Sequence, residues 1–449
     1  MSAAQGPWRG RRLHFVGVGG AGMSAYARAA AALGAEVSGS DSARSPYAER
    51  LAADGVLQAA VGHRADNLPA GEDVEVVYSS AVAEDNVERR AARERGLRER
   101  PRAEILAQLS ALRRTIAVAG THGKTTTAAM IVHGLRGAGL DPGWLIGGAP
   151  GAGLANAHWG TGEWLVVEAD ESDRSMLSLE LEIAVLTSAE LDHHATFASL
   201  AALHEAFRAF LARARAAVIV LERPELLALA HGAAAELVPY GPGEYALTRG
   251  GARFRWRGHE VSLRVPGAHN VADAVAALEA TRLAGADETR VVDALARFPG
   301  AGRRFELVGE SERGALVYDD YAHHPTEIAA TVQGARTLQP RRLIAVFQPH
   351  LYSRTALLAR DFGRALAGAD VACVLEVYPA RERATDHPGV SGLSIAESTA
   401  NAAAGRPVYW LPTFADAEPP LRALLEGGDL CLVMGAGDVD QLARRLVAR

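Results

Sequence analysis

Short apolar runs rich in β-branched residues alternate with longer stretches of helical spacing along the whole chain. Examples of the apolar runs are "LHFVGVGG", "TIAVAG", "WLVVEA" and "RLIAVFQ". Strands that alternate with helices are typical of α/β layers with parallel sheets. We therefore predict an α/β fold.

Three segments each begin with a strand and a turn of the kind that binds nucleotides. The first runs from "LHFVGVGGAGMS" through "VEVVYSSAV" to the helical stretch "RAEILAQLSALRR". The second opens with "TIAVAGTHGKTTTAAM" and ends after a hairpin-like stretch, "GARFRWRGHEVSLRVPG". The third follows "FPGAG", with strands expected at "ALVYDDYA", "RLIAVFQPH", "VACVLEVYP" and "DLCLVMGAG". The length of 449 residues fits this division, since a domain has roughly 150 residues.

Composition narrows the class of protein. The formal net charge of −6 argues against a nucleic-acid partner or an anionic membrane surface. The N-terminus has no apolar signal core, and no uncharged apolar stretch is long enough for a membrane span. We expect a cytoplasmic protein without membrane insertion.

Cys373 and Cys431 lie in apolar runs without a CxxC pattern, so they are expected to be buried structural thiols.

Lys124 is the only lysine of the chain, and it lies in the loop "GTHGKTTT" between a strand and a helix. Backbone N–H groups at a helix N-terminus bind phosphates, and glycine allows close approach. A lysine can reach between phosphates, and Thr125 can offer its hydroxyl to Mg²⁺. Val118 replaces the first glycine of the strict P-loop pattern, and a chance "GKT" is the alternative. The predicted nucleotide-binding residues are Gly120, Thr121, His122, Gly123, Lys124, Thr125 and Thr126.

Acidic residues follow two of the predicted strands. Glu168 comes at the end of "WLVVE", where a second ligand for Mg²⁺ is expected. Asp170, Glu171 and Asp173 follow it and could equally form a solvated loop. His193, in "AELDHH", could be a metal ligand or proton carrier, although a surface histidine is the commoner outcome.

The N-terminal turn carries a GxGxxG pattern from Gly17 to Gly22, and Asp41 ends the next strand. This fingerprint is usual for NAD, but the same geometry binds any diphosphate at a helix N-terminus. The glycines could also serve only the packing of the strand against the helix.

In the third segment, polar residues lie at the ends of predicted strands. Ligands bind at such ends in parallel sheets, but a capping role is equally common there. These residues are Arg303, Arg304, Asp320, His323, His324, His350 and Arg354.

Taken in order, the motifs resemble the Mur ligases of peptidoglycan synthesis. The matching stretches are "GTHGKTTT", "EADESD", "LDHH", "GAHNVADA", "RRFE", "DDYAHHPTEI" and "FQPHLYSRT". The resemblance implies three domains: a Rossmann-like UDP-substrate domain at 1–108, a central P-loop-type ATPase domain with a parallel sheet at 109–300, and a Rossmann-like C-terminal domain at 301–449. It is strongest to the branch that joins L-alanine to UDP-N-acetylmuramate, using ATP and Mg²⁺, with Mn²⁺ as an alternative ion.

The resemblance also implies roles for individual residues. Catalytic roles fall to Lys124, Glu168, His193, Arg304 and Asp320. Thr125, Glu168 and His193 would hold the metal, and His269, Asn270 and Arg304 would complete the ATP site. The sugar-nucleotide would contact Gly19, Gly20, Ala21, Gly22, Met23, Ser24, Asp41, Ser79 and Ser80. Tyr321, His323 and Arg354 would line the amino-acid pocket.

Four positions depart from the family pattern: Leu351 stands for arginine, Asp273 for asparagine, Ser188 for asparagine and Arg174 for glycine. Three other functions stay open at this point. A related ligase attaches a preformed tripeptide to the same sugar-nucleotide. The GxGxxG turn with Asp41 could serve an NAD(P)-dependent oxidoreductase, and an inactive nucleotide-binding scaffold is the third alternative. A monomer and a homodimer are both compatible with the sequence.

Overall fold

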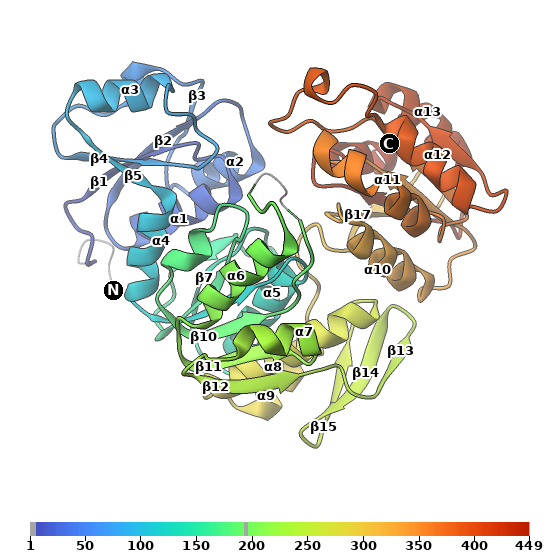
Figure 1. Cartoon of the computed structure of the whole chain (residues 1–449), viewed down its shortest axis with the longest axis horizontal. Helices are drawn as coiled ribbons and strands as arrows, with labels where there is room; N and C mark the ends of the chain where they lie inside the picture. Colours follow the sequence, from blue (N-terminus) through green and yellow to red (C-terminus); the bar gives the residue numbers. More distant parts are fainter. Residues whose placement is uncertain (1–5, 193–195, 449) are drawn as a thin grey trace. The chain divides into compact units, whose positions relative to one another are not determined.

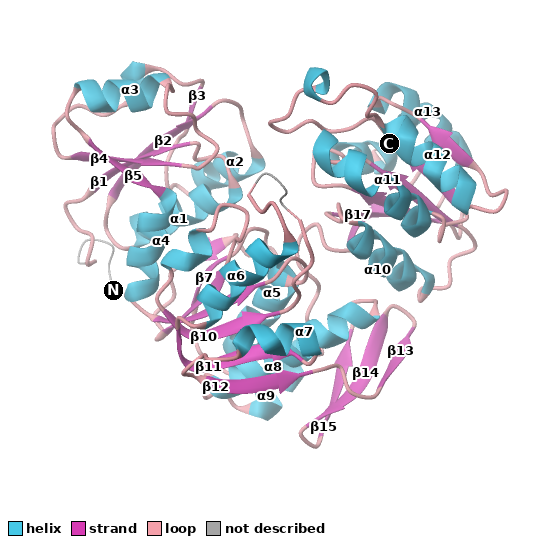
Figure 2. Ribbon diagram, viewed as in Figure 1, coloured by secondary structure: helices cyan, strands magenta, loops and turns pink. Residues whose placement is uncertain are grey.

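The computed structural model describes residues 6–192 and 196–448. It consists of α/β layers, as predicted (Figures 1 and 2). Its contacts divide the chain into two compact units. The first contains Met1–Gly241 and Asp273–Leu295, and the second contains Pro242–Ala272 and Ala296–Arg449.

The first unit begins with a five-stranded parallel sheet in the order β3-β2-β1-β4-β5. Its strands are β1 (Arg12–Val16), β2 (Glu36–Asp41), β3 (Ala60–Val61), β4 (Val74–Tyr78) and β5 (Arg98–Pro101). Its helices are α1 (Ala21–Ala32), α2 (Pro46–Ala53), η2 (Ala65–Asn67), α3 (Val87–Glu94) and α4 (Arg102–Ala111). The alternation of apolar strands and helical spacing therefore predicted this part correctly.

A seven-stranded sheet in the order β12-β11-β10-β6-β9-β7-β8 forms the rest of the first unit. All its pairs are parallel except β7 with β8. The strands are β6 (Arg114–Ala119), β7 (Gly143–Leu145), β8 (Ala157–His158), β9 (Trp164–Glu168), β10 (Leu181–Leu186), β11 (Ala214–Leu221) and β12 (Glu236–Tyr240). The helices are α5 (Lys124–Gly137), η3 (Ser175–Ser178), α6 (Leu200–Leu211), α7 (Pro224–Leu227), η4 (Ala228–Ala230) and α9 (Glu288–Leu295). Helix α8 (Ala268–Leu283) begins in the second unit and continues into the first.

One apolar core joins these two sheets. It includes Phe15 of β1, Ile105 of α4 and Leu165 of β9, none of which is exposed to solvent. Since the two sheets bury side chains in common, residues at their edges are held in a fixed relation within this unit.

The second unit contains two sheets. The predicted hairpin forms β14 (Gly251–Trp256) and β15 (His259–Leu263), and β13 (Tyr245–Thr248) adds a third antiparallel strand. The other sheet has the order β16-β17-β21-β18-β19-β20, with only β16 antiparallel to its neighbour among the described strands.

The strands of this six-stranded sheet are β16 (Glu306–Glu310), β17 (Leu316–Asp320), β18 (Leu343–Phe347), β19 (Val371–Val374), β20 (Val408–Trp410) and β21 (Leu430–Met434). Its helices are α10 (Pro325–Arg336), α11 (Tyr352–Leu366), η5 (Ala384–Asp386), α12 (Gly392–Ala402), α13 (Phe414–Leu424) and α14 (Asp440–Val447). Cys373 and Cys431 are buried in it without a disulfide, as predicted. In the described part of the chain, no helix is long and apolar enough to cross a membrane.

Candidate functional site

The loop between β6 and α5 requires glycine at two positions. Gly120 and Gly123 have φ values of 135° and 81°, which side chains with a Cβ rarely adopt. A Cβ on Gly120 would lie 2.3 Å from Thr187 Oγ1, and one on Gly123 would lie 2.6 Å from Asp273 Oδ1. The loop therefore leads from β6 directly into α5, and the N-terminus of a helix is a place where an anion can bind.

Lys124, the first residue of α5, points its ammonium back into this loop. Its Nζ donates to Gly120 O at 2.5 Å, to Thr121 O at 3.1 Å and to Glu171 Oε1 at 3.0 Å. Burial alone would lower the pKa of Lys124, but the carboxylates of Glu171 and Glu168 outweigh it and raise the pKa. A permanent positive charge therefore lies where the loop would receive a phosphate.

Glu168, at the end of β9, faces the second residue of α5. Thr125 Oγ1 donates to Glu168 Oε1 at 2.9 Å, and the N–H of Gly147 donates to Oε2 at 2.7 Å. A hydroxyl and a carboxylate in contact are oxygen donors of the kind that Mg²⁺ selects. Thr125 and Glu168 therefore fit the predicted metal site.

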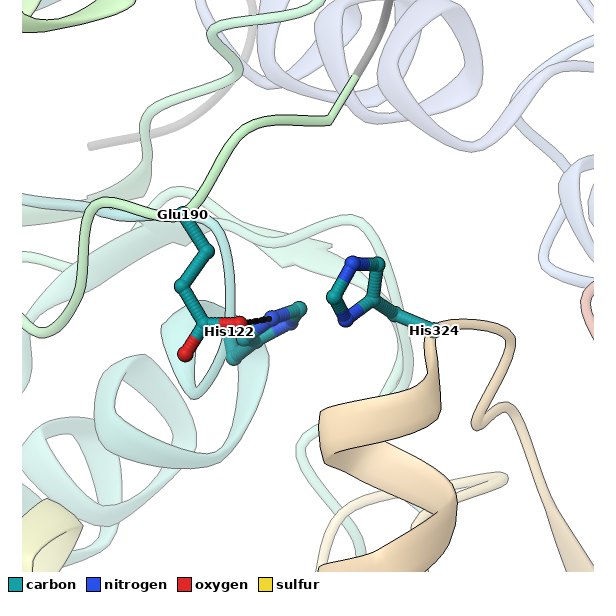
Figure 3. A group of neighbouring side chains, drawn as sticks. All are labelled: His122, Glu190 and His324. Carbon is teal, nitrogen blue, oxygen red and sulfur yellow. Dashed lines mark ion pairs between the residues drawn. The ribbon is translucent and has the colours of Figure 1, made fainter. Parts of the chain in front are cut away.

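The loop is also tied to the segment after β10. Thr121 Oγ1 donates to Glu190 O at 2.8 Å, and the N–H of His122 donates to Ser188 Oγ at 2.8 Å. His122 Nε2 lies 3.4 Å from Glu190 Oε2, as the dashed line in Figure 3 marks. Thr126, in the first turn of α5, is buried. His193 lies outside the described residues.

Arg102 makes ionic contacts that the sequence did not predict. It follows β5 directly, and it donates to Asp170 Oδ2 at 2.9 Å and to Asp173 Oδ2 at 2.6 Å. Burial would raise the pKa of Asp170, but the charge of Arg102, the hydrogen bonds from Ser172 and the charge of Lys124 together outweigh burial and lower the pKa to about 2. The acids after Glu168 are therefore not a solvated loop. Glu171 is paired with Lys124, and Asp170 and Asp173 connect the segment after β9 to the first residue of α4.

The N-terminal glycine turn is held by the carboxylate that the sequence placed at the end of β2. The N–H of Gly19 donates to Asp41 Oδ2 at 2.8 Å, and Ser45 Oγ donates to Gly19 O at 2.8 Å. A Cβ on Gly19 would lie 2.7 Å from Ser45 Oγ and 2.9 Å from Asp41 Oδ2. In a dinucleotide site this acid binds the ribose hydroxyls. Here one oxygen of Asp41 accepts a hydrogen bond from the turn itself, so this carboxylate has a structural role without any dinucleotide.

The other predicted sugar-nucleotide residues surround the same turn. Gly17 has φ of 84°, and a Cβ on it would lie 3.4 Å from Ser79 Cβ. Ser24 is buried, and its Oγ receives a hydrogen bond from Asn156 Nδ2 at 3.1 Å. Gly20 precedes α1, and Ala21, Gly22 and Met23 form its first turn, with Met23 buried. Ser80 is exposed after β4.

In the second unit, Asp320 ends β17 and holds the backbone around it. Its two oxygens accept from the N–H of Phe305 at 2.8 Å and of Ala322 at 2.7 Å. Burial raises the pKa of Asp320 to about 6, although Arg304 opposes the shift. The Arg304 guanidinium lies 5.2 Å from the centre of the Tyr321 ring, so three predicted residues come together here.

The remaining predicted residues of the second unit make three separate sets of contacts. His323 Nδ1 lies 2.9 Å from Tyr321 O, and its ring packs edge-on to that of Tyr321 at 5.4 Å. Arg354 is buried and lies 3.2 Å from His350 Nδ1 through its Nη1. At the start of α8, Asn270 Nδ2 donates to Pro266 O at 2.7 Å.

Burial lowers the pKa of His269 to about 4, with Glu327 opposing and Arg304 assisting the shift. The charge of Arg304 thus acts on the His269 ring. His269 is therefore neutral at physiological pH.

Comparison with known proteins identifies the family. Models described as "Mur ligase family, catalytic domain", "Mur ligase middle domain" and "Mur ligase, glutamate ligase domain" match residues 12–114, 118–281 and 303–437. A UDP-N-acetylmuramate--L-alanine ligase of Rubrobacter xylanophilus is 43% identical over 455 residues, which cover 98% of this chain and 100% of the relative. The chain belongs to the Mur ligase family.

Two further members of the Mur ligase family agree with this assignment. A UDP-N-acetylmuramate--L-alanine ligase of Mycobacterium sp. (strain JLS) is 40% identical over 477 residues, covering 100% of this chain and 97% of the relative. The crystal structure of a UDP-N-acetylmuramate-alanine ligase from Thermotoga maritima matches with a TM-score of 0.82 at 28% identity, covering 97% of this chain and 98% of the other. The predicted α/β fold and family resemblance are thus confirmed.

Two of the four departures from the family pattern lie at backbone conformations that are unusual for their residue type. Arg174 has φ of 60°, in the left-handed region where glycine is favoured. Leu351, directly before α11, has φ of 73°, which is unusual for a branched aliphatic residue and costs conformational energy. Ser188 accepts from the loop, as stated above, and Asp273 is buried next to Gly123.

Proposed function

We propose that this Mur ligase joins L-alanine to the lactyl carboxylate of UDP-N-acetylmuramate and converts ATP to ADP and phosphate. The observation that carries the proposal is the full-length similarity to relatives that are named for this reaction, with the lysine-bearing phosphate loop intact. The domain boundaries at 1–108, 109–300 and 301–449 and a cytoplasmic location are part of the proposal. Nucleic acid and membrane have no role in it.

The reaction proceeds in two steps. The lactyl carboxylate is a poor electrophile, so its oxygen first attacks the γ-phosphorus of ATP, and the bond to ADP breaks. The amine of L-alanine then attacks the carbonyl carbon of the acyl phosphate, loses a proton, and expels inorganic phosphate. Catalysis of such transfers depends on positioning and charge stabilisation more than on a side-chain nucleophile.

The residues of the first unit supply charge and orientation for the first step. Lys124 stabilises the negative charge on the transferring phosphoryl group, and its salt bridge to Glu171 keeps it protonated. Thr125 and Glu168 hold Mg²⁺, with Mn²⁺ as the alternative, and the ion neutralises phosphate charge when bound. The turn at Gly19 binds the UDP diphosphate through backbone N–H groups at the start of α1.

The residues of the second unit have proposed roles toward ATP and the amino acid. Arg304 contributes positive charge, and Asp320 holds the backbone N–H groups of Phe305 and Ala322. His269 and Asn270 contact the adenine side as neutral groups. Tyr321, His323 and Arg354 receive the amino acid, with Arg354 facing its carboxylate. His193 keeps its proposed role at the metal.

Omission of single components tests this function. Phosphate release from ATP is measured with the purified protein, Mg²⁺, UDP-N-acetylmuramate and L-alanine, and then with each component left out. Release that needs all of them supports the proposal. Release with a tripeptide in place of alanine, and none with alanine, would assign the tripeptide-adding reaction instead. No phosphate release with either amine would favour an inactive nucleotide-binding scaffold.

A comparison of the mass of the protein in solution with that of one chain distinguishes the monomer from the homodimer.

A further inference from the structure

Arg102, the first residue of α4, lies against the first turns of α1. A Cβ on Gly22 would lie 3.0 Å from Arg102 Nη1, so the glycine leaves room for the guanidinium there. Burial raises the pKa of Tyr26, in the second turn of α1, to about 12, and the charge of Arg102 opposes this shift. The side chain of Arg102 is 13% exposed. A largely buried cation therefore neighbours the helix start that is proposed to bind the UDP diphosphate.

The same guanidinium is held from the other side by the segment after β9. Its Nε donates to Asp173 Oδ2 at 2.6 Å, and its Nη2 donates to Asp170 Oδ2 at 2.9 Å. The segment begins at Glu168, the proposed metal ligand, and its Glu171 pairs with Lys124. Two carboxylates hold a planar guanidinium in one orientation, because its donor directions are fixed. Arg102 therefore joins α1 to the segment that carries the metal and phosphate groups.

Asn156 makes a second connection to the same turn of α1. Its Nδ2 donates to Ala21 O at 2.8 Å. Asn156 lies in the loop between β7 and β8, and its carbonyl accepts from the N–H of Ile146 at 2.9 Å. The next residue, Gly147, donates its N–H to Glu168 Oε2 at 2.7 Å. Both connections therefore lead from the start of α1 to the surroundings of Glu168.

These connections matter because the two proposed substrate sites belong to different sheets. The glycine turn follows β1 of the five-stranded sheet, and the phosphate loop follows β6 of the seven-stranded sheet. Helix α4 packs against both α1 and η3 (Figure 1). Reacting atoms must approach to about 3–3.5 Å, and a displacement of about 1 Å can lower a rate roughly a hundredfold. The contacts that set the spacing of the two sites therefore bear directly on the rate.

We infer that Arg102 and Asn156 are positioning residues that hold the sugar-nucleotide turn at reacting distance from the phosphate loop. This inference rests on the proposed function, because it assumes that a carboxylate of the UDP-linked substrate attacks ATP. Neither residue needs to touch the reacting atoms. When the Arg102 contacts are lost, each ligand keeps its own binding groups, but the two ligands are misaligned when both are bound.

Steady-state kinetics of the full chain with Arg102→Gln test this inference. We expect kcat for alanine-dependent phosphate release to fall roughly tenfold to a hundredfold, while KM for ATP and KM for UDP-N-acetylmuramate stay within about twofold. Arg102→Lys keeps the charge and should restore part of kcat. Arg89→Gln is the matched control, since Arg89 is 7% exposed and pairs with Glu99 at 2.7 Å within the five-stranded part of the unit. That variant should lose stability but keep the wild-type kcat.

An unchanged kcat in Arg102→Gln would overturn the inference alone. So would KM values that rise together as kcat falls, because that result indicates a structural role. If Arg102→Gln fails to fold, Asn156→Ala decides, since it removes no charge: the same fall in kcat supports the inference, and an unchanged kcat overturns it. A wild type without alanine-dependent phosphate release would overturn the proposed function and the inference together.

Discussion

The ammonium of Lys124 and the carboxylate of Glu171 lie 3.0 Å apart at the first turn of α5. Glu171 is 1% exposed, and Lys124 is 15% exposed. The pair keeps the single lysine of the chain charged in a confined position between two loop carbonyls. A planar guanidinium is larger and has fixed donor directions, so arginine cannot replace lysine here as it does elsewhere in this sequence.

Lys124→Arg should therefore lose most activity although it keeps the charge. We expect phosphate release to fall by about a hundredfold or more, the usual effect of removing one preorganised contact to transition-state charge. The converse exchange on the surface, Arg215→Lys, is the control, since Arg215 is 68% exposed and pairs with Glu180. That variant should retain wild-type activity. Equal rates of phosphate release for Lys124→Arg and the wild type would show that a guanidinium fits the loop as well as the ammonium does.

Glu168→Gln should weaken the response to Mg²⁺. The amide keeps the size and can still accept from Thr125, but it lacks the charge that attracts the ion. We expect the Mg²⁺ concentration for half-maximal phosphate release to rise roughly tenfold or more, and a chelator should abolish release by the wild type. Glu180→Gln, a change at a half-exposed carboxylate, should leave the Mg²⁺ response unchanged. An identical Mg²⁺ curve for Glu168→Gln would exclude Glu168 as a ligand.

Gly19→Ala should impair binding of the sugar-nucleotide, because its Cβ would collide with Ser45 and Asp41. We expect KM for UDP-N-acetylmuramate to rise about tenfold, in proportion to the loss of one or two hydrogen bonds, with KM for ATP nearly unchanged. At Gly241 a Cβ would meet only Glu222 Oε2, at 3.9 Å. Gly241→Ala is thus the matched control. A rise in both KM values would show that Gly19→Ala disturbs more than the turn.

Glu88 of α3 should make the first unit sensitive to acid. Burial would raise its pKa, but hydrogen bonds from His14, Ser40 and Asn67 outweigh burial and lower the pKa to about 2, against the usual 4.5. The folded state therefore binds fewer protons than the unfolded state in that range. The stabilisation is complete above about pH 4.5 and is lost as pH falls toward 2. The shift corresponds to about 3 kcal/mol.

Urea unfolding of the wild type and of Glu88→Gln at a series of pH values measures this effect. The difference in free energy of unfolding should be about 3 kcal/mol at neutral pH and should shrink below pH 4.5. Hydrogen exchange of the β1 and β2 amides locates the change. A difference that does not vary with pH would show that the charge of Glu88 contributes nothing.

The sequence was sufficient where local pattern decides structure. The strand before Gly120 and the helix from Lys124 followed from apolar spacing and glycine placement. Glu168 could be placed because carboxyl ends of parallel strands meet at one edge. The buried cysteines followed equally from their apolar runs.

Contacts between distant segments could not be read in the same way. Arg102 and Asp170 are 68 positions apart, and the local sequence around each residue does not predict the ion pair between them. Asp41 matched a dinucleotide fingerprint by position, but its carboxylate faces Gly19 because the turn is tight enough to reach it. The left-handed φ of Arg174 and of Leu351 opposes their intrinsic preference, so tertiary structure overrides local propensity there.

The position of Lys124 has a practical consequence for covalent chemistry. Acylating reagents that target ε-amines find one in this protein, protonated and largely covered in the folded state. The folded chain should therefore resist such reagents, and an unfolded chain should gain one label at the phosphate loop. Labelling stoichiometry becomes a direct measure of how much of a preparation has an intact nucleotide site.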